Sequence, residues 1–188
     1  MKGVKAKYCG VDVGLRKSHA ALISNKLEFV GDYEELEFEE VKVAGIDAPL
    51  SFPAKGNLRE CERLLLKMGI RLFPSGAPFF RSIALKGMEI AERLRGYGIK
   101  VYEVYPYATR VILNIAPKEK KQTKRGLEAI RAELSRWVEI PELSHDEVDA
   151  VVAALTVKLY SEGMGVKLEG IDGSIVVPKG RVQLSLNP

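Results

Sequence analysis

Residues 8–14, Tyr-Cys-Gly-Val-Asp-Val-Gly, form a short apolar run with one acid, Asp12, near its end. The run predicts a buried strand that stops at its last glycine. Two later stretches repeat this pattern: 45–49, Gly-Ile-Asp-Ala-Pro, with Asp47, and 101–106, Val-Tyr-Glu-Val-Tyr-Pro, with Glu103. A charged carboxylate in such a place is costly unless it is paired, hydrogen-bonded or bound to metal. One such acid could cap a turn, but three indicate a common site, because α/β sheets gather ligands at the carboxyl ends of their strands.

The order of apolar patterns predicts strands first, and then helices alternating with strands. The expected strands cover residues 19–24, 27–30, 36–38, 41–47, 99–104, 175–177 and 182–186. The expected helices cover residues 57–68, 82–95, 106–113, 124–137 and 145–159. An antiparallel meander followed by parallel strands makes a mixed sheet with helices on both faces, which belongs to the α/β class. Since no repeat or linker divides the chain, residues 1–188 are expected to form a single domain.

The last predicted helix carries two further acids, Asp146 and Asp149, which share one face because they are three residues apart. Ser144 and Glu147 form a capping box at its start. Small residues, Ala150 among them, continue the acidic face and would let the helix approach a sheet closely. Helix-dipole stabilisation is the alternative explanation, and it accounts for Asp146 better than for Asp149, which lies deeper in the helix.

Acids that face one another raise each other's pKa, and hard cations compensate for this repulsion. Ligand sets made only of oxygen suit Mg²⁺ or Mn²⁺. The chain has two His and two Cys and no Cys-x-x-Cys pair, so a zinc site is not expected. Two hard cations about 4 Å apart are a known arrangement for phosphodiester hydrolysis.

Basic and acidic residues are concentrated in different segments. Residues 118–136 hold seven Lys or Arg and three Glu, so their surplus of four equals the net charge of +4 of the whole chain. Residues 32–40 hold six acids and no base. A charge run is most often a solvated face. The basic segment therefore indicates a phosphate partner only if it lies beside a site that handles phosphate.

Length, composition and cysteine content narrow the class of protein. A chain of 188 residues, 46% apolar, can bury a core, and two cysteines do not make a disulfide scaffold. No apolar run approaches the roughly 20 residues that cross a bilayer. Residues 1–8 do not fit a signal peptide. We therefore expect a cytoplasmic protein with reduced thiols and no membrane partner.

The acid pattern resembles RNase H-like nucleases of the Holliday-junction resolvase (RuvC-like) branch. The resemblance rests on residues 10–14, on Asp47 and on residues 146–156, Asp-Glu-Val-Asp-Ala-Val-Val-Ala-Ala-Leu-Thr. With residues 101–106 and Gly-Ser-Ile-Val-Val-Pro at 173–178, the chain is more closely similar to an uncharacterised prokaryotic family of predicted RNase H-fold nucleases.

This resemblance implies particular roles for residues of both segments. It makes Asp12, Asp47, Asp146 and Asp149 metal ligands, and Glu103 a fifth ligand or a group that supports the ligands. It places Lys120, Lys121 and Lys124, with Arg125 beside them, as contacts to substrate phosphates.

The leading hypothesis is a Mg²⁺- or Mn²⁺-dependent nuclease that hydrolyses DNA or RNA by a two-metal carboxylate mechanism. The alternative is a binding module that keeps the fold and binds nucleic acid or protein without turnover. A third class, the ATP-binding fold of sugar kinases and actin, needs a second domain and a second phosphate loop, which the chain lacks. Nucleic acid is the expected partner, and assembly as a homodimer is left open.

Overall fold

The computed structural model describes residues 8–180. Its main sheet has five strands in the order β3-β2-β1-β4-β5. The strands are β1 Tyr8–Asp12, β2 His19–Ile23, β3 Leu27–Asp32, β4 Val43–Asp47 and β5 Lys100–Glu103. β2 runs antiparallel to β1 and β3, whereas β1, β4 and β5 are parallel. This topology confirms the predicted mixed sheet and is that of the RNase H-like fold.

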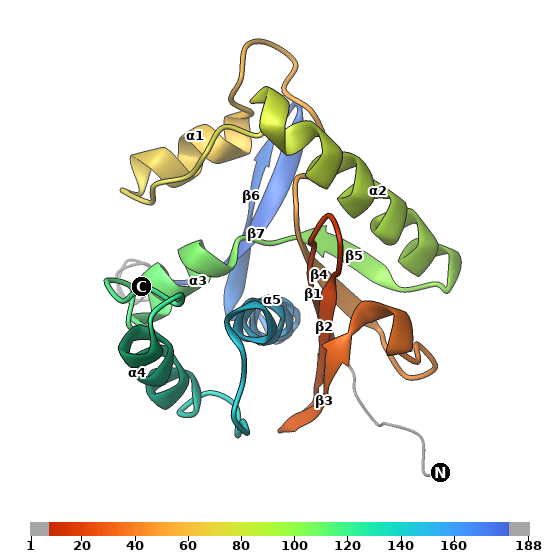
Figure 1. The fold of residues 1–188 in the computed structure, drawn as a ribbon. Helices are drawn as coiled ribbons and strands as arrows, with labels where there is room; N and C mark the ends of the chain where they lie inside the picture. The colour runs from red at the N-terminus through yellow and green to blue at the C-terminus, as the bar shows by residue number, and fades with distance from the viewer. Residues whose placement is uncertain (1–7, 181–188) are drawn as a thin grey trace.

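Helices cover both faces of this sheet, as the sequence predicted (Figure 1). The helices are α1 Glu60–Lys67, α2 Arg81–Gly96, α3 Pro106–Leu113, α4 Lys124–Leu134 and α5 His145–Ser161, with short 3₁₀ turns η1 Tyr33–Glu35 and η2 Pro78–Phe80. α2 packs on one face through buried residues such as Ile90 and Leu94. α5 packs on the other face, between the sheet and the pair α3 and α4. In the described part of the chain, no helix is long and apolar enough to span a bilayer.

Helix α5 is buried on all sides over residues 150–157. Its start is defined by the predicted capping box. The Ser144 hydroxyl accepts a hydrogen bond from the Glu147 amide at 3.3 Å, and the Glu147 carboxylate accepts one from the Ser144 amide at 2.7 Å. These bonds satisfy amide groups that no helical carbonyl can reach. The capping box therefore sets where the acid-bearing first turns of α5 begin.

Two glycines let α5 lie directly against the backbone of the sheet. A Cβ atom at Gly10 in β1 would overlap the backbone of α5 at Ala150 and Ala154. A Cβ atom at Gly45 in β4 would press on α5 at Ala153. This close approach confirms the expectation from the small residues of the helix. It brings the first turns of α5 within side-chain reach of the ends of β1 and β4.

A two-stranded hairpin, β6 Gly165–Gly170 and β7 Gly173–Pro178, extends the structure beyond the edge of β5. Val176 bridges to Val104 in parallel orientation, and the hairpin packs on α1 and α5. The predicted strand at 175–177 is present, but its partner in the described structure is β6, which the sequence reading missed. The proposed partner at 182–186 lies outside the described residues.

The expected strand at 36–38 is wrong. Asp32 accepts a hydrogen bond from the Glu34 amide at 3.0 Å, which starts the η1 turn and takes the chain away from the sheet. Leu36 is nevertheless buried in the core beside Tyr33. Leu36 is therefore apolar because it is buried as part of a loop, and not because it belongs to a strand.

Candidate metal centre

Three aspartates from three different elements converge at the carboxyl ends of β1 and β4. Asp12 and Asp47 are direct neighbours in the parallel register of these strands, so their side chains point to the same face of the sheet. Asp149 approaches them from the second turn of α5. One carboxylate oxygen from each residue lies within 4.8 Å of the other two.

Burial and mutual repulsion make these carboxylates hard to ionise. Burial, followed by repulsion from Asp149, raises the pKa of Asp12 from 3.8 to about 7. Burial and the two neighbouring aspartates raise the pKa of Asp47 well above its ordinary range. Burial also raises the pKa of Asp149, against the opposing effect of Lys121. A cluster of this kind is stabilised by a cation placed among its oxygens.

Lys121 brings a positive charge into the cluster. Its ammonium group forms an ion pair with the Asp149 carboxylate, and 23% of its side chain is exposed. Burial alone would lower the pKa of Lys121, but the three aspartates outweigh this effect and raise it. Lys121 is therefore a charged member of the site.

Arg110 of α3 holds the loop that carries Lys121. Its guanidinium donates hydrogen bonds to the carbonyl oxygens of Ile115 at 3.2 Å, Ala116 at 2.6 Å and Glu119 at 3.1 Å. Ala116 has a positive φ of 39°, a backbone conformation that costs energy for a residue with a side chain. These three bonds therefore fix a loop whose shape local preference would not favour. Sequence reading missed Arg110, although it is the one charged residue in the run 106–113.

The cluster opens into a cleft of about 720 Å³ that carries several basic groups. Asp47 and Asp149 lie on its wall, and its basic lining residues are Arg71, Arg110, Lys118, Lys120 and Lys121. Two of the predicted phosphate contacts, Lys120 and Lys121, are thus beside the aspartates. Lys124 and Arg125 lie on the exposed first turn of α4 and do not line the cleft.

Asp146 lies outside the cluster formed by Asp12, Asp47 and Asp149. Its side chain is 41% exposed and contacts the imidazole of His145 at 3.2 Å. Its charge is nevertheless close enough to raise the pKa of Asp12 and of Asp149.

Glu103 is directed away from the three aspartates. It pairs in register with Ile46, the residue before Asp47, so its side chain points to the opposite face of the sheet. There the Arg59 guanidinium donates two hydrogen bonds to its carboxylate, at 2.7 and 2.5 Å. The Leu50 amide donates a third at 2.8 Å. Burial raises the pKa of Glu103, while these bonds act in the opposite direction.

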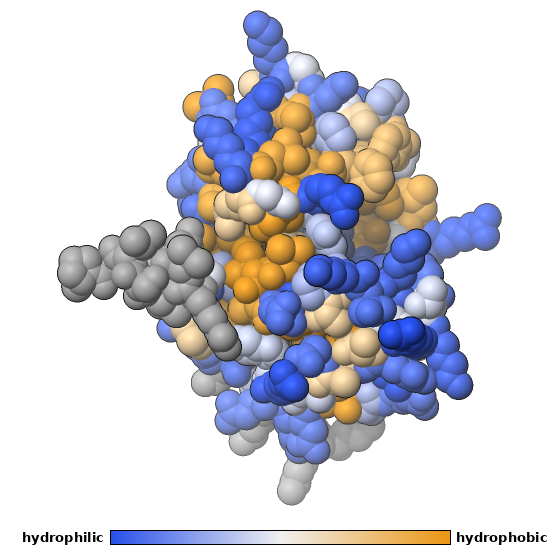
Figure 2. Space-filling view, turned by 90° about the vertical axis from the view of Figure 1, so that its left-hand side faces the viewer, coloured by the Kyte–Doolittle hydropathy of each residue, from blue (hydrophilic) through white to orange (hydrophobic). Residues whose placement is uncertain are grey.

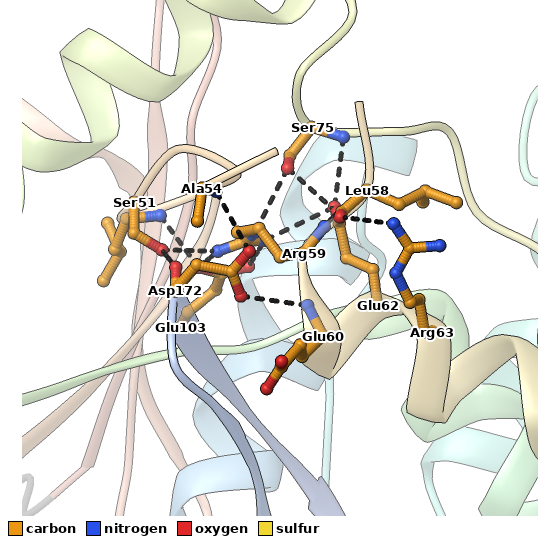
Figure 3. Close-up of polar contacts among 11 residues, drawn as sticks. Ser51, Ala54, Leu58, Arg59, Glu60, Glu62, Arg63, Ser75, Glu103 and Asp172 are labelled. Atoms are coloured by element: carbon orange, nitrogen blue, oxygen red, sulfur yellow. Dashed lines mark hydrogen bonds and ion pairs between the residues drawn. The ribbon is translucent and has the colours of Figure 1, made fainter. Parts of the chain in front are cut away.

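The same network joins the segment after β4, helix α1, the loop at Ser75 and the β6–β7 turn (Figure 3). Ser51 accepts a hydrogen bond from Arg59 at 3.0 Å and donates one to the Asp172 carbonyl in the β6–β7 turn at 2.6 Å. Glu62 of α1 binds both Arg59 and Ser75. Glu103 therefore anchors the chain that follows Asp47, and this role could be found only by identifying Arg59 as its partner.

The fold and the aspartate cluster define the class: an RNase H-like α/β protein with three clustered carboxylates that could hold a metal ion. The chain belongs to the family described as "Protein of unknown function (DUF429)", whose model matches residues 9–169.

Two solved structures are similar to this chain. The first is described as "Thermus thermophilus RuvC structure", with 13% identity, a TM-score of 0.49, and coverage of 88% of this chain and 98% of that chain. The second is T. thermophilus RuvC in complex with Holliday junction substrate, with 15% identity, a TM-score of 0.47, and coverage of 89% and 99%. A comparison with curated proteins found no match.

Proposed function

We propose that the protein is a metal-dependent phosphodiesterase that acts on nucleic acid. The observation that carries this proposal is the convergence of Asp12, Asp47 and Asp149, two of which, Asp47 and Asp149, line a basic cleft. A ligand that brings positive charge to the aspartates and negative charge to the lysines and arginines would match both parts of this lining. A phosphate chain held beside a metal ion is such a ligand.

The donor set fits hard cations. The three side chains offer only carboxylate oxygens, which Mg²⁺ and Mn²⁺ prefer. Burial and repulsion raise the pKa of Asp12 to about 7, and one lysine offsets the charge of only one aspartate. Asp12, Asp47 and Asp149 would hold the cations, and Asp146, in the first turn of α5, would be a further ligand. Bound there, the cations would activate water and stabilise the leaving oxygen of a phosphodiester.

The residues of the chain itself would position the substrate. Lys118, Lys120 and Lys121 line one wall of the cleft and Arg71 contributes from another segment, so a phosphate backbone would meet positive charge along the cleft. Lys124 and Arg125 would extend this contact beyond it. Glu103 would act as a positioning residue, because it holds the backbone at Leu50, three residues after Asp47.

The test is cleavage of a panel of single-stranded, duplex and branched DNA and RNA with Mg²⁺ or Mn²⁺. Asp12→Asn should abolish cleavage while the protein stays folded. Glu142→Gln is the matched control, because that side chain is 88% exposed and away from the cluster, and it should cleave like the wild type. Cleavage that persists in Asp12→Asn would refute the proposed site, and a panel without any divalent-dependent cleavage would refute the proposed activity.

A binding module without turnover is the second candidate, and the Lys121–Asp149 ion pair favours it. An internal lysine can stabilise an acidic cluster in a protein that no longer uses metal. This candidate predicts salt-dependent nucleic-acid binding and no heat of Mn²⁺ binding in calorimetry. Mn²⁺ binding that Asp12→Asn abolishes would instead support the phosphodiesterase.

A further inference from the structure

A second, smaller cavity of about 120 Å³ lies next to the basic cleft. Its walls are largely apolar and aromatic, with Pro49, Leu65, Phe73, Phe80 and Ile83 among the lining residues. Its polar lining includes three buried side chains of the network in Figure 3, namely Arg59, Glu62 and Glu103. The small cavity therefore differs in chemistry from the cleft, whose wall is basic.

The cavity and the cleft meet at the metal centre. Asp47, Leu72, Phe73 and Tyr105 line both of them. A group in the small cavity would therefore lie directly beside a chain that runs through the cleft and past Asp47. Tyr105 lies at this junction, and an aromatic ring can stack on a base.

Phe73 is exposed to a degree that packing within the chain does not explain. Its side chain is 72% exposed, and its ring lies 6.4 Å from that of Phe80, between centroids. Figure 2 views the side of the molecule that carries α1, and shows an apolar area bordered by hydrophilic residues. The exposed apolar residues of α1 and the loop after it include Leu66, Met68 and Phe73.

Three polar side chains of the cavity lining, Arg59, Glu62 and Glu103, are already paired with one another. Arg59 donates to Glu103 and Glu62, and the three side chains are 1%, 7% and 4% exposed, respectively. Away from Asp47, which belongs to the aspartate cluster, the cavity thus presents mainly apolar and aromatic walls. An engineered cavity of about 150 Å³ is known to take up benzene, so a volume of about 120 Å³ suits one flat ring.

We propose that this cavity receives one unpaired nucleobase of a nucleic-acid strand whose backbone lies in the basic cleft, with Phe73 and Phe80 as stacking partners. The proposal rests on the proposed function, because it takes the occupant of the cleft to be nucleic acid. Positive charge along the cleft and aromatic rings at its side are the combination that binds single strands. The substrate class is then nucleic acid with an unpaired base next to the scissile phosphate, and recognition is by stacking rather than by base identity.

The experiment compares two ligands of equal charge. Fluorescence anisotropy measures binding of a short oligothymidylate and of an oligomer of the same length made of abasic sugar phosphates, both with Ca²⁺. The wild type should bind the thymidylate at least about fivefold more tightly, since stacking on a protein aromatic contributes roughly 1–3 kcal/mol per base. Phe73→Ala should remove most of this difference, and Phe73→Trp should keep it.

Tyr97→Ala is the control for loss of an exposed aromatic ring. Tyr97 is 62% exposed and lies at the end of α2, away from both cavities, so this variant should bind both ligands like the wild type. A duplex of the same length should show no dependence on Phe73, because its bases are already stacked.

The outcomes separate this proposal from the proposed function. Equal binding of the two oligomers, or a thymidylate preference that survives in Phe73→Ala, would overturn the base cavity even if the protein cleaves nucleic acid. A preference that depends on Phe73 would uphold it even if no cleavage is found.

Discussion

Replacing Asp12 by asparagine removes one charge from the aspartate cluster, and we expect it to stabilise the metal-free protein. The pKa of Asp12 is raised from 3.8 to about 7 in the folded state, mainly by burial and then by repulsion from Asp149. One pKa unit corresponds to about 1.4 kcal/mol. Ionised Asp12 therefore lowers the free energy of unfolding by up to about 4 kcal/mol, and we expect a gain of about 2–4 kcal/mol from Asp12→Asn.

The pH dependence of this gain follows from the direction of the shift. Below about pH 4, Asp12 is protonated in both the folded and the unfolded chain, so its charge costs nothing. Between about pH 4 and 7 the unfolded chain loses the proton first, so the stability of the wild type falls as pH rises. The two proteins should therefore be about equally stable near pH 4 and differ fully near pH 8.

The assay is urea unfolding followed by circular dichroism in EDTA at both pH values. Adding Mn²⁺ at 100 times its dissociation constant should then stabilise the wild type by about 2.7 kcal/mol and leave Asp12→Asn nearly unchanged. Asp146→Asn, in the first turn of α5, is the control. Its side chain is 41% exposed, so the loss of a favourable helix-dipole interaction should make it less stable by under about 1 kcal/mol. An Asp12→Asn protein that is less stable than the wild type near pH 8 would refute the electrostatic reasoning.

Three further substitutions test other parts of the site. Lys121→Met removes a positive charge from the cluster, so calorimetry should show about tenfold tighter Mn²⁺ binding, and urea unfolding in EDTA should show lower stability. Gly10→Ala places a Cβ against the backbone of α5 and should cost about 3 kcal/mol, whereas Gly96→Ala, in open space within α2, should raise the melting temperature slightly. Arg59→Met leaves the Glu103 carboxylate buried without its partner. It should lower the free energy of unfolding in urea by about 3–5 kcal/mol. The double variant Arg59→Met, Glu103→Leu should regain part of this loss.

The three clustered aspartates were predictable because each lies in a pattern that local sequence reveals. Asp12 and Asp47 end apolar strands, and parallel strands bring their carboxyl ends to one edge. Asp149 follows from a capping box that defines where α5 begins. Once α5 packs on the sheet, these three positions come together.

Glu103 shows where this reasoning fails. It also ends an apolar strand, but the side on which it points depends on the register between β4 and β5. A shift of one residue exchanges the two faces of a strand, and the sequence of β5 is too short, at four residues, to define the register alone. The ion pair with Arg59 joins residues that are 44 positions apart, and no local pattern indicates such a pair.

The conformation of the loop that carries Lys121 could not be predicted from the local sequence either. This loop explains why only some of the basic residues in 118–136 lie at the site. The basic surplus of residues 118–136 looks uniform in sequence. Arg110, itself buried, binds the carbonyl groups of the first part of this loop, and this draws Lys121 into the cleft, whereas Lys124 begins an exposed helix. The position of a charge relative to the aspartates therefore depends on backbone hydrogen bonds from another helix, and composition cannot reveal them.

The energetics of the cluster connect the fold with the proposed chemistry. The close contact of α5 with Gly10 and Gly45 forces three carboxylates together in a partly buried place, where each opposes ionisation of the others. A protein that only needed to be stable would gain from asparagine or an apolar residue at any of the three positions. Lys121 offsets part of this cost through its ion pair with Asp149, whereas Asp12 and Asp47 form no ion pair within residues 8–180. The remaining negative charge lies beside the basic residues of the cleft, and under the proposed function a cation that arrives with a phosphate chain would neutralise it.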